Sequence, residues 1–259
     1  MVVGDPRSQE RIEQLARRLH HPDPSQLFFQ VTEIGGDRVY LRHGIEVGPG
    51  DVVLDVGANV GVAAVFFAAL CGASAVHSFE PVGPICDLLR ANVAGLDACV
   101  VHQQGLSDAA GSAEIAYYPG ACAMSGLYAD PARDRELVRT VLLNHGLSEA
   151  EAQERLRGRY EPQKLDCELT TVSAVLHRES IVRVSLLKID VERAELDVLR
   201  GIDEPDWERI DQIVLEVHDE DGRRERVAET LRCHDFDVVC DQEPMMAGTG
   251  VWMLYARRP

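Results

Sequence analysis

The chain has 259 residues and carries 26 lysines and arginines against 43 aspartates and glutamates, so its formal net charge is −17. Apolar residues make up 46% of the chain, which is enough for a sizeable core and argues against global disorder. A chain this acidic lacks the basic field needed to bind nucleic-acid phosphates or an anionic membrane surface, and we expect neither as a partner.

The N-terminal part is predicted to be a cap on a larger domain. Residues 8–20 repeat apolar side chains at helical spacing, which is typical of an amphipathic helix. Residues 27–47 alternate apolar and polar side chains around Gly35-Gly36-Asp37, which predicts a β-hairpin. We therefore expect a cap of helix and hairpin over residues 1–44 and one domain over residues 45–259.

From residue 51 onward, strands and helices alternate along the chain. Strands are predicted at 51–56, 75–80, 98–104, 184–190, 212–218, 237–240 and 250–256, and helices at 60–71, 84–94, 193–199 and 223–234. This alternation is typical of an α/β fold whose parallel sheet is covered on both faces, and the last two strands should form an antiparallel hairpin.

One stretch interrupts this rhythm. Residues 120–164 contain two charged segments with helical spacing, near 132–144 and 148–157. An insertion of this length between sheet elements is usually functional, and we expect a helical lid.

Cysteine usage and the absence of targeting signals bear on the compartment. The seven cysteines are odd in number and widely spaced, without a CxxC pair or a zinc-finger pattern, which is typical of a reducing environment. The N-terminus does not look like a signal peptide, and the longest apolar run, residues 60–71, is too short to span a bilayer. We expect the protein to be cytoplasmic.

The strongest local motif is the glycine-containing turn Asp55-Val56-Gly57-Ala58-Asn59-Val60-Gly61. A strand runs directly into a helix, so a ligand can approach the backbone and the free N–H groups of the helix start. The spacing is not the G-x-G-x-x-G of a dinucleotide site. In addition, Asp55 would repel a pyrophosphate but suits a ligand that carries a positive charge.

A second carboxylate completes this pattern. Glu80 ends the next strand, 23 residues after Gly57, a placement that fits hydrogen bonds to the two hydroxyls of a ribose. A nucleoside with a positive charge and no phosphate is therefore expected, and S-adenosylmethionine meets this description. NAD binding, and strand-end carboxylates without any ligand, remain as alternatives.

These motifs, together with Phe79-Glu80-Pro81 and Leu187-Lys188-Ile189-Asp190-Val191-Glu192-Arg193-Ala194-Glu195, resemble the FkbM-type family of S-adenosylmethionine-dependent methyltransferases over about residues 45–258. The stretches 124–130 and 215–219 and the helical insertion resemble a narrower group, the O-methyltransferase domains of polyketide and nonribosomal peptide assembly lines. One departure is Arg193, where the family usually has glycine. This departure matters little if the position only begins a helix.

The resemblance implies a Rossmann-like class I methyltransferase with a seven-stranded, mostly parallel sheet and a reversed C-terminal hairpin. It implies that Gly57 and Asn59 line the methionine end of the cofactor, that Glu80 holds the ribose, and that Leu106 and Ser107 lie by the adenine. The remaining expected cofactor contacts are Asp55, Gly61, Pro81, Ser125 and Asp190.

A hydroxyl acceptor needs a general base next to the transferred methyl group. In an open parallel sheet the site lies beyond the carboxyl ends of the strands, where Glu216 and His218 share one face of a strand. His218 is our candidate base, because the pKa of histidine lies near working pH. The expected partners that orient and charge-balance it are Glu192, Asp190 and Glu216.

A metal-assisted mechanism is the chemical alternative at this position. Asp190, Glu216, His218 and Asp219 could bind Mg²⁺ or Mn²⁺ and lower the pKa of the acceptor hydroxyl. The narrower resemblance favours the histidine base, so a divalent metal is possible but not favoured, and we assign no metal ligands.

The expected function is therefore O-methylation of a hydroxyl on a polyketide or peptide intermediate, carried by an acyl carrier protein and with neighbouring synthase domains as further partners. Arg133, Arg135 and Arg139 could receive an acidic carrier. The rival functions are N- or sugar O-methylation of a free small molecule, and a non-catalytic module that only binds the cofactor.

Overall fold

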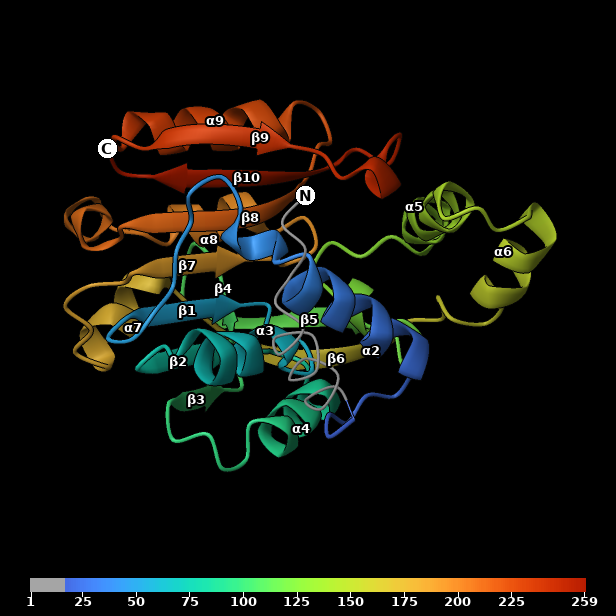
Figure 1. The fold of residues 1–259 in the computed structure, drawn as a ribbon, viewed down its shortest axis with the longest axis horizontal. Helices are drawn as coiled ribbons and strands as arrows, with labels where there is room; N and C mark the ends of the chain where they lie inside the picture. Colours follow the sequence, from blue (N-terminus) through green and yellow to red (C-terminus); the bar gives the residue numbers. More distant parts are fainter. Residues whose placement is uncertain (1–16) are drawn as a thin grey trace.

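A seven-stranded sheet runs through the middle of the molecule, with helices on both faces (Figure 1). The computed structural model describes residues 17–259. The strand order is β3-β2-β1-β7-β8-β10-β9, and β10 runs antiparallel to both of its neighbours, β8 and β9. The strands are β1 Val52–Val56, β2 Ala75–Phe79, β3 Cys99–His102, β7 Leu186–Ile189, β8 Gln212–His218, β9 Asp237–Asp241 and β10 Val251–Arg257. This order confirms the predicted α/β class and its reversed C-terminal hairpin.

The strand register brings the ends of β1, β7 and β8 to one edge of the sheet. Val56 pairs with Ile189, and Ile189 pairs with Leu215. Since β8 continues for three residues beyond Leu215, its last residues extend past the end of β7. Residues that follow β7 therefore meet Glu216 and His218 at this edge.

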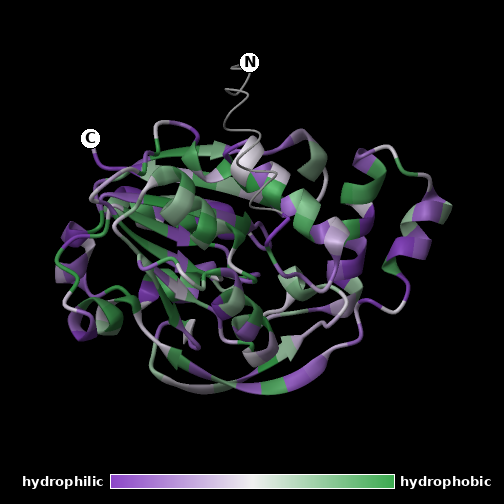
Figure 2. Cartoon of the chain, turned by 60° about the horizontal axis from the view of Figure 1, so that its bottom comes forward, coloured by the Kyte–Doolittle hydropathy of each residue, from purple (hydrophilic) through white to green (hydrophobic). Residues whose placement is uncertain are grey.

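Successive side chains of a strand point to opposite faces, and the core divides accordingly. Val53 of β1 packs in one apolar cluster with the N-terminal cap, while Leu54 packs in a second cluster on the other face. Figure 2 shows the central strands as largely hydrophobic. The helices of the first face are α3 Val62–Val65, its π-helical continuation η3 Phe66–Cys71, and α4 Gly83–Asn92; those of the second are α7 Val172–Arg178, α8 Glu195–Arg200, the 3₁₀ helix η5 Glu204–Arg209, and α9 Arg223–Cys233.

The predicted hairpin over residues 27–47 is wrong. This stretch forms α2 Pro24–Gln30, a π-helical turn η1 Val31–Gly36 and a 3₁₀ turn η2 Val39–Leu41. The start is capped by Asp23, whose side chain accepts a hydrogen bond from the Ser25 amide, and Pro24 occupies the first helical position. The glycine pair read as a hairpin turn ends a helix instead. The helix predicted at 8–20 lies mostly outside the described residues.

A second, three-stranded sheet was not predicted. It has the order β4-β6-β5 and is formed by β4 Gly105–Leu106, β5 Gly111–Tyr117 and β6 Gln163–Thr170. β5 and β6 pair antiparallel and enclose the insertion, which begins with the short 3₁₀ helix η4 Cys122–Met124.

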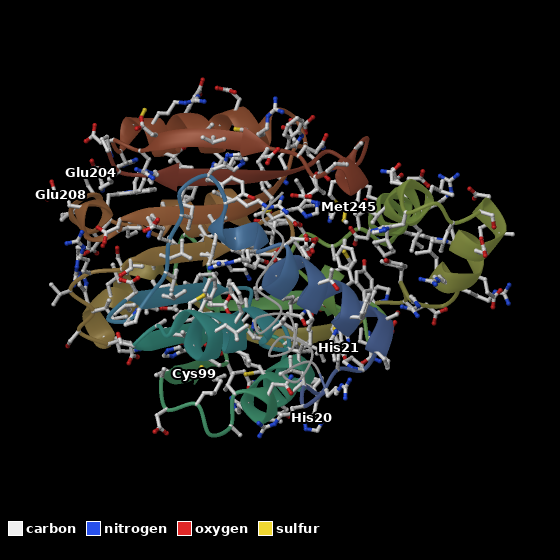
Figure 3. The ribbon with its side chains drawn as sticks, viewed as in Figure 1. His20, His21, Cys99, Glu204, Glu208 and Met245 are labelled. Carbon is white, nitrogen blue, oxygen red and sulfur yellow. The ribbon has the colours of Figure 1, made fainter. Side chains whose placement is uncertain are left out.

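The insertion forms a helical arm beside the body (Figure 1). Its helices are α5 Pro131–Asn144 and α6 Glu149–Leu156. Asp130 caps α5, and Ser148 caps α6 in a reciprocal capping box with Glu151. The C-terminal end of α5 is tied to the β9–β10 connection, where the 3₁₀ helix η6 Pro244–Met246 lies, because Asn144 donates to the carbonyls of Met245 and Ala247 at 2.8 and 2.9 Å. Figure 3 places Met245 on the side of the hairpin that faces α5.

Among the described residues, no helix has the length and hydrophobicity needed to cross a membrane.

Candidate active site

A cavity of about 980 Å³ opens at the carboxyl ends of β1, β2, β7 and β8. Its lining includes residues just beyond each of these strands, and it extends outward between α2 and the helical arm. The volume lies at the upper end of the range usual for ligand sites, so two ligands can meet inside it.

The glycine-containing turn after β1 forms one wall of the cavity. Gly57 has a φ of +75°, and a Cβ atom there would lie 1.8 Å from the carbonyl oxygen of Asp190. Glycine therefore allows the turn to touch the loop that follows β7. The two motifs recognised separately in the sequence form one surface.

Glu80 lies beside this turn, directly after β2. Its two carboxylate oxygens accept hydrogen bonds from the Asn59 amide at 3.0 Å and the Val82 amide at 2.9 Å. Burial raises the pKa of Glu80 to about 7, against the lowering effect of these two bonds. The carboxylate is thus held in one orientation, with lone pairs left to accept further hydrogen bonds.

Behind the turn lies a buried ion pair between Lys188 of β7 and Asp55 of β1. The Lys188 Nζ atom lies 3.1 Å from Asp55 Oδ1 and donates to the Gly57 carbonyl at 2.7 Å. Burial lowers the pKa of Lys188, but the Asp55 and Asp190 carboxylates raise it above its usual value, so the lysine stays charged. Lys188 lines the cavity, whereas the side chain of Asp55 lies behind the wall, fully buried.

Three side chains converge where β7 and β8 end. His218 Nε2 lies 3.1 Å from Glu192 Oε2 and 3.6 Å from Glu216 Oε1. All three line the cavity, and His218 and Glu192 are buried. Burial lowers the pKa of His218, but the two glutamates raise it well above its usual value, so the imidazolium form is favoured. Both carboxylates approach the same ring nitrogen, Nε2.

The N-terminal cap adds two residues to this region that the sequence did not indicate. The Tyr40 hydroxyl donates to Asp190 Oδ2 at 2.9 Å, and the ring of Tyr40 lies beneath the Lys188 ammonium. Glu33 lines the cavity, and burial together with the charges of Glu216 and Asp190 raises its pKa to about 8. The sequence has no motif around these two residues. Its alternation of apolar and polar side chains there predicts a hairpin, which does not point to a site.

The outer part of the cavity is apolar. Its walls come from α2, from the helical arm and from the β9–β10 connection, and they carry Phe28, Phe29, Leu137, Val138, Val141, Leu142, Met245 and Met246. The helical arm is held to α2 by the ion pair between Arg159 and Asp23 and by a hydrogen bond from Gln26 to the Gly120 carbonyl. The cavity thus has a polar inner end and an apolar outer chamber.

The model of the methyltransferase FkbM domain matches residues 55–239, which include the turn after β1, Glu80, the loop after β7 and His218. The chain belongs to the FkbM methyltransferase family. It is an S-adenosylmethionine-dependent methyltransferase.

Two relatives of this FkbM-family chain are named for FK506 and for an antimetabolite. It is 41% identical to the 31-O-demethyl-FK506 methyltransferase FkbM of Streptomyces tacrolimicus over 245 residues, which cover 92% of each chain. It is 39% identical to the AMB antimetabolite synthetase AmbE of Pseudomonas aeruginosa over 88% of this chain and 11% of the synthetase. A solved S-adenosylmethionine-dependent O-methyltransferase from Thermotoga maritima shares 11% identity at a TM-score of 0.44, over 86% of this chain and 64% of that one.

Most of the residues expected at the FkbM-type site line the cavity. On the cofactor side these are Gly57, Asn59, Glu80, Pro81, Leu106, Ser125 and Asp190, and on the acceptor side Glu192, Glu216 and His218. Asp55, Gly61 and Ser107 do not line it. For Asp55, this placement differs from the predicted direct contact with a positively charged ligand, because Lys188 already compensates its charge.

Two further expectations differ from what the structure shows. Asp219, one of the candidate metal ligands, does not line the cavity and accepts a hydrogen bond from the Arg224 amide at 3.1 Å. The ligand atoms that cluster within 4.8 Å of one another are those of Glu192, Glu216 and His218. Arg193 does more than begin a helix, because its guanidinium is buried in ion pairs.

Proposed function

We propose that this protein methylates a hydroxyl group of a natural-product intermediate, with His218 as the general base. The observation that supports this most is the shared cavity, in which the His218 cluster faces the same space as Glu80 and Gly57. A proton acceptor and a nucleoside site at one end of a cavity suit transfer to a weak nucleophile. We further infer that residues 1–44 act as a cap and residues 120–164 as a lid on one methyltransferase domain.

The residues present fit the methyl donor. Glu80 would accept hydrogen bonds from the ribose hydroxyls, Gly57 and Asn59 would border the methionine end, and Leu106 would pack by the adenine. Lys188, the cation nearest the turn, is already paired with Asp55 and is not free for a pyrophosphate, which argues against NAD. When bound, S-adenosylmethionine supplies a methyl group on a positively charged sulfur.

His218 receives the proton that the acceptor hydroxyl loses. Glu192 and Glu216 stabilise the imidazolium that this transfer forms, in the way a carboxylate supports histidine in other base-catalysed reactions. The same two carboxylates keep His218 protonated when the cavity is empty of ligands, since they raise its pKa. Turnover therefore requires that this proton is lost first, and we expect activity to increase with pH.

The acceptor is apolar over much of its surface, because the outer chamber is lined by aromatic and aliphatic side chains. This favours a polyketide or peptide intermediate over a free sugar. Delivery by a carrier protein is supported by the similarity to a stretch of AmbE. However, Arg133 and Arg139, two of the arginines expected to receive a carrier, are paired with carboxylates of this chain.

We infer a cytoplasmic reaction, because all seven cysteines are free thiols.

Mass-shift analysis with trideuteromethyl-labelled S-adenosylmethionine tests the function. Hydroxylated macrocycles and hydroxyacyl groups are offered both free and on an acyl carrier protein, with amine and sugar acceptors alongside. Label on a hydroxyl of an apolar acceptor supports the proposal. Label found only on an amine or a sugar contradicts it. Cofactor binding in calorimetry without label on any acceptor would leave the non-catalytic module that only binds the cofactor.

The His218→Ala variant tests the base. It should bind S-adenosylmethionine as the wild type does but lose turnover by a factor of about 10² to 10⁴. The control is His177→Ala, since His177 is exposed on α7 and does not line the cavity. Turnover at the wild-type rate in the His218 variant would show that another group removes the proton.

A further inference from the structure

We propose that Arg193 is a positioning residue, which joins the helical lid to the loop that carries Glu192 and to the loop that follows His218, and so holds this pair together. The proposal rests on the proposed role of His218. It concerns a residue that does not itself line the cavity.

The Arg193 guanidinium bridges two carboxylates from different parts of the chain. Its Nη1 atom donates to Asp134 Oδ1 at 2.7 Å, and its Nε atom donates to Glu220 Oε1 at 2.8 Å. The side chains of Arg193 and Asp134 are 4% and 0% exposed. Arg193 directly follows Glu192, and Glu220 comes two residues after His218. The bridge therefore links the loop that carries Glu192 to the loop that follows His218.

Asp134 fixes the lid to this bridge. It lies in the first turn of α5, and its second oxygen accepts hydrogen bonds from the Tyr118 hydroxyl at 2.9 Å and the Asp130 amide at 3.0 Å. Arg133, next to it on α5, lies 3.1 Å from Glu220. The base of the lid is thus tied to the loop after β7 and to the loop after β8.

The backbone at this point is in a conformation that only glycine adopts freely. Glu192 has a φ of +51° and Arg193 a φ of +78°, two consecutive residues in the left-handed region. Such a turn persists when its surroundings hold it, and the two ion pairs of Arg193 provide this hold. The same turn directs the Glu192 carboxylate to within 3.1 Å of His218.

Lid position and base geometry are consequently coupled. If α5 moves outward, Asp134 draws Arg193 with it, the turn relaxes, and Glu192 leaves His218. The imidazole would then keep only the carboxylates that face it from elsewhere, Glu216 of β8, Asp190 after β7 and Glu195 of α8. His218 therefore has its highest pKa, and is the strongest base, only when the acceptor chamber is closed.

The test uses the ligand-free full-length protein and the variant Arg193→Lys. Lysine keeps the positive charge, so the field at His218 changes little, but one ammonium cannot bridge both carboxylates. We expect amide hydrogen exchange in residues 131–144 and 191–194 to become faster by about tenfold. We also expect the His218 pKa, followed by NMR of the imidazole, to fall by about one unit.

The matched control is Arg139→Lys, since Arg139 is a lid arginine whose partners, Glu136 and Glu149, both belong to the lid. It should change neither the amide hydrogen exchange of residues 191–194 nor the His218 pKa. Unchanged exchange and an unchanged His218 pKa in Arg193→Lys would overturn the link, whatever the methyl-transfer assay shows. If the link holds but no hydroxyl is methylated, the proposed function fails instead.

Asp134→Asn is the second variant, for use if Arg193→Lys does not fold. Asparagine preserves the shape and can still accept from Tyr118, but it loses the charge that holds Arg193. Faster exchange in both 131–144 and 191–194 supports the link. Faster exchange in the lid alone shows that the catalytic loop does not depend on it and overturns the proposal.

Discussion

His218 Nε2 lies 3.1 Å from Glu192 Oε2, although His218 ends β8 and Glu192 belongs to the loop after β7. The parallel register of β7 and β8 makes this contact possible, because β8 extends beyond the end of β7. Glu216, two residues earlier on β8, approaches the same nitrogen at 3.6 Å. The proton on His218 therefore lies next to two negatively charged carboxylates.

This relationship predicts an unusual pH dependence. Because Glu192 and Glu216 raise the pKa of His218 well above its usual value, the neutral base is scarce near neutrality, and the methyl-transfer rate should rise as pH increases through that value. Glu192→Gln keeps the shape but removes the nearer charge. The rise should then move to lower pH, which rate measurements over pH 6 to about 10 would show.

Stability should follow the opposite sign. A histidine whose folded pKa is raised contributes stability at pH values below its unfolded pKa of about 6.5, and this contribution is lost as pH rises through the folded pKa. The free energy of unfolding of the wild type, measured by urea titration, should decrease over that pH window. The decrease should be smaller in Glu192→Gln.

The rate prediction has a clear contradicting outcome. An identical pH–rate profile in wild type and Glu192→Gln would mean that the titrating group is not His218.

Glu80 predicts that cofactor binding strengthens as pH increases. Burial raises its pKa to about 7, so much of the carboxyl is protonated at neutral pH, whereas ribose hydroxyls donate best to the ionised form. S-adenosylhomocysteine should bind more tightly at pH 8 than at pH 6, with release of a proton. Calorimetry in buffers of different ionisation enthalpy measures that proton.

Glu80→Gln should weaken binding and remove its pH dependence. The matched control is Glu195→Gln, because burial also raises the pKa of Glu195 to about 7 but this residue does not line the cavity. If the proton release persists in the Glu80 variant and disappears in the Glu195 variant, the ribose assignment is wrong.

The buried pair of Lys188 and Asp55 predicts a large loss of stability on removal of one partner. Lys188→Met would leave Asp55 charged and uncompensated in the core, at a cost of about 3–5 kcal/mol in the free energy of unfolding. Adding Asp55→Asn should restore part of it. The control is Arg183→Met, since Arg183 pairs with Asp211 at 74% side-chain exposure and should cost at most about 1 kcal/mol. Denaturant titration compares all three.

The central sheet could be predicted from the sequence because β1, β2, β7 and β8 are rich in apolar side chains and each is followed by a helical period. The second sheet could not, since β5 (GSAEIAY) and β6 (QKLDCELT) mix charged and apolar residues and gain their register only from pairing with each other. The cap was misassigned because the Gly35-Gly36 pair suits a hairpin as well as a helix end. Asp23 followed by Pro24 was the signal for a helix start.

The candidate site was predictable where one short motif carries both the position and the chemistry, as with Gly57 and Glu80. Contacts between distant motifs were not. The Tyr40 hydroxyl reaches Asp190 across 150 residues of sequence, and Arg193 reaches Asp134 in the insertion. Asp55 was misplaced for a related reason, since the sequence does not show that Lys188 on the neighbouring strand faces it.

The rim of the outer chamber gives a prediction about the acceptor. Phe28 of α2 lines the cavity yet is 74% exposed, so a large apolar side chain remains in water until something covers it. Covering a phenylalanine side chain contributes about 1.5–3 kcal/mol, so Phe28→Ala should raise the KM for an apolar acceptor by about 10- to 100-fold. The affinity for S-adenosylhomocysteine should stay the same, because Phe28 lies on α2, away from Gly57 and Glu80.

Val182→Ala is the control, since Val182 is 79% exposed and does not line this cavity. Initial-rate kinetics with one labelled acceptor separates KM from kcat, and an unchanged KM in Phe28→Ala would place the acceptor elsewhere in the chamber.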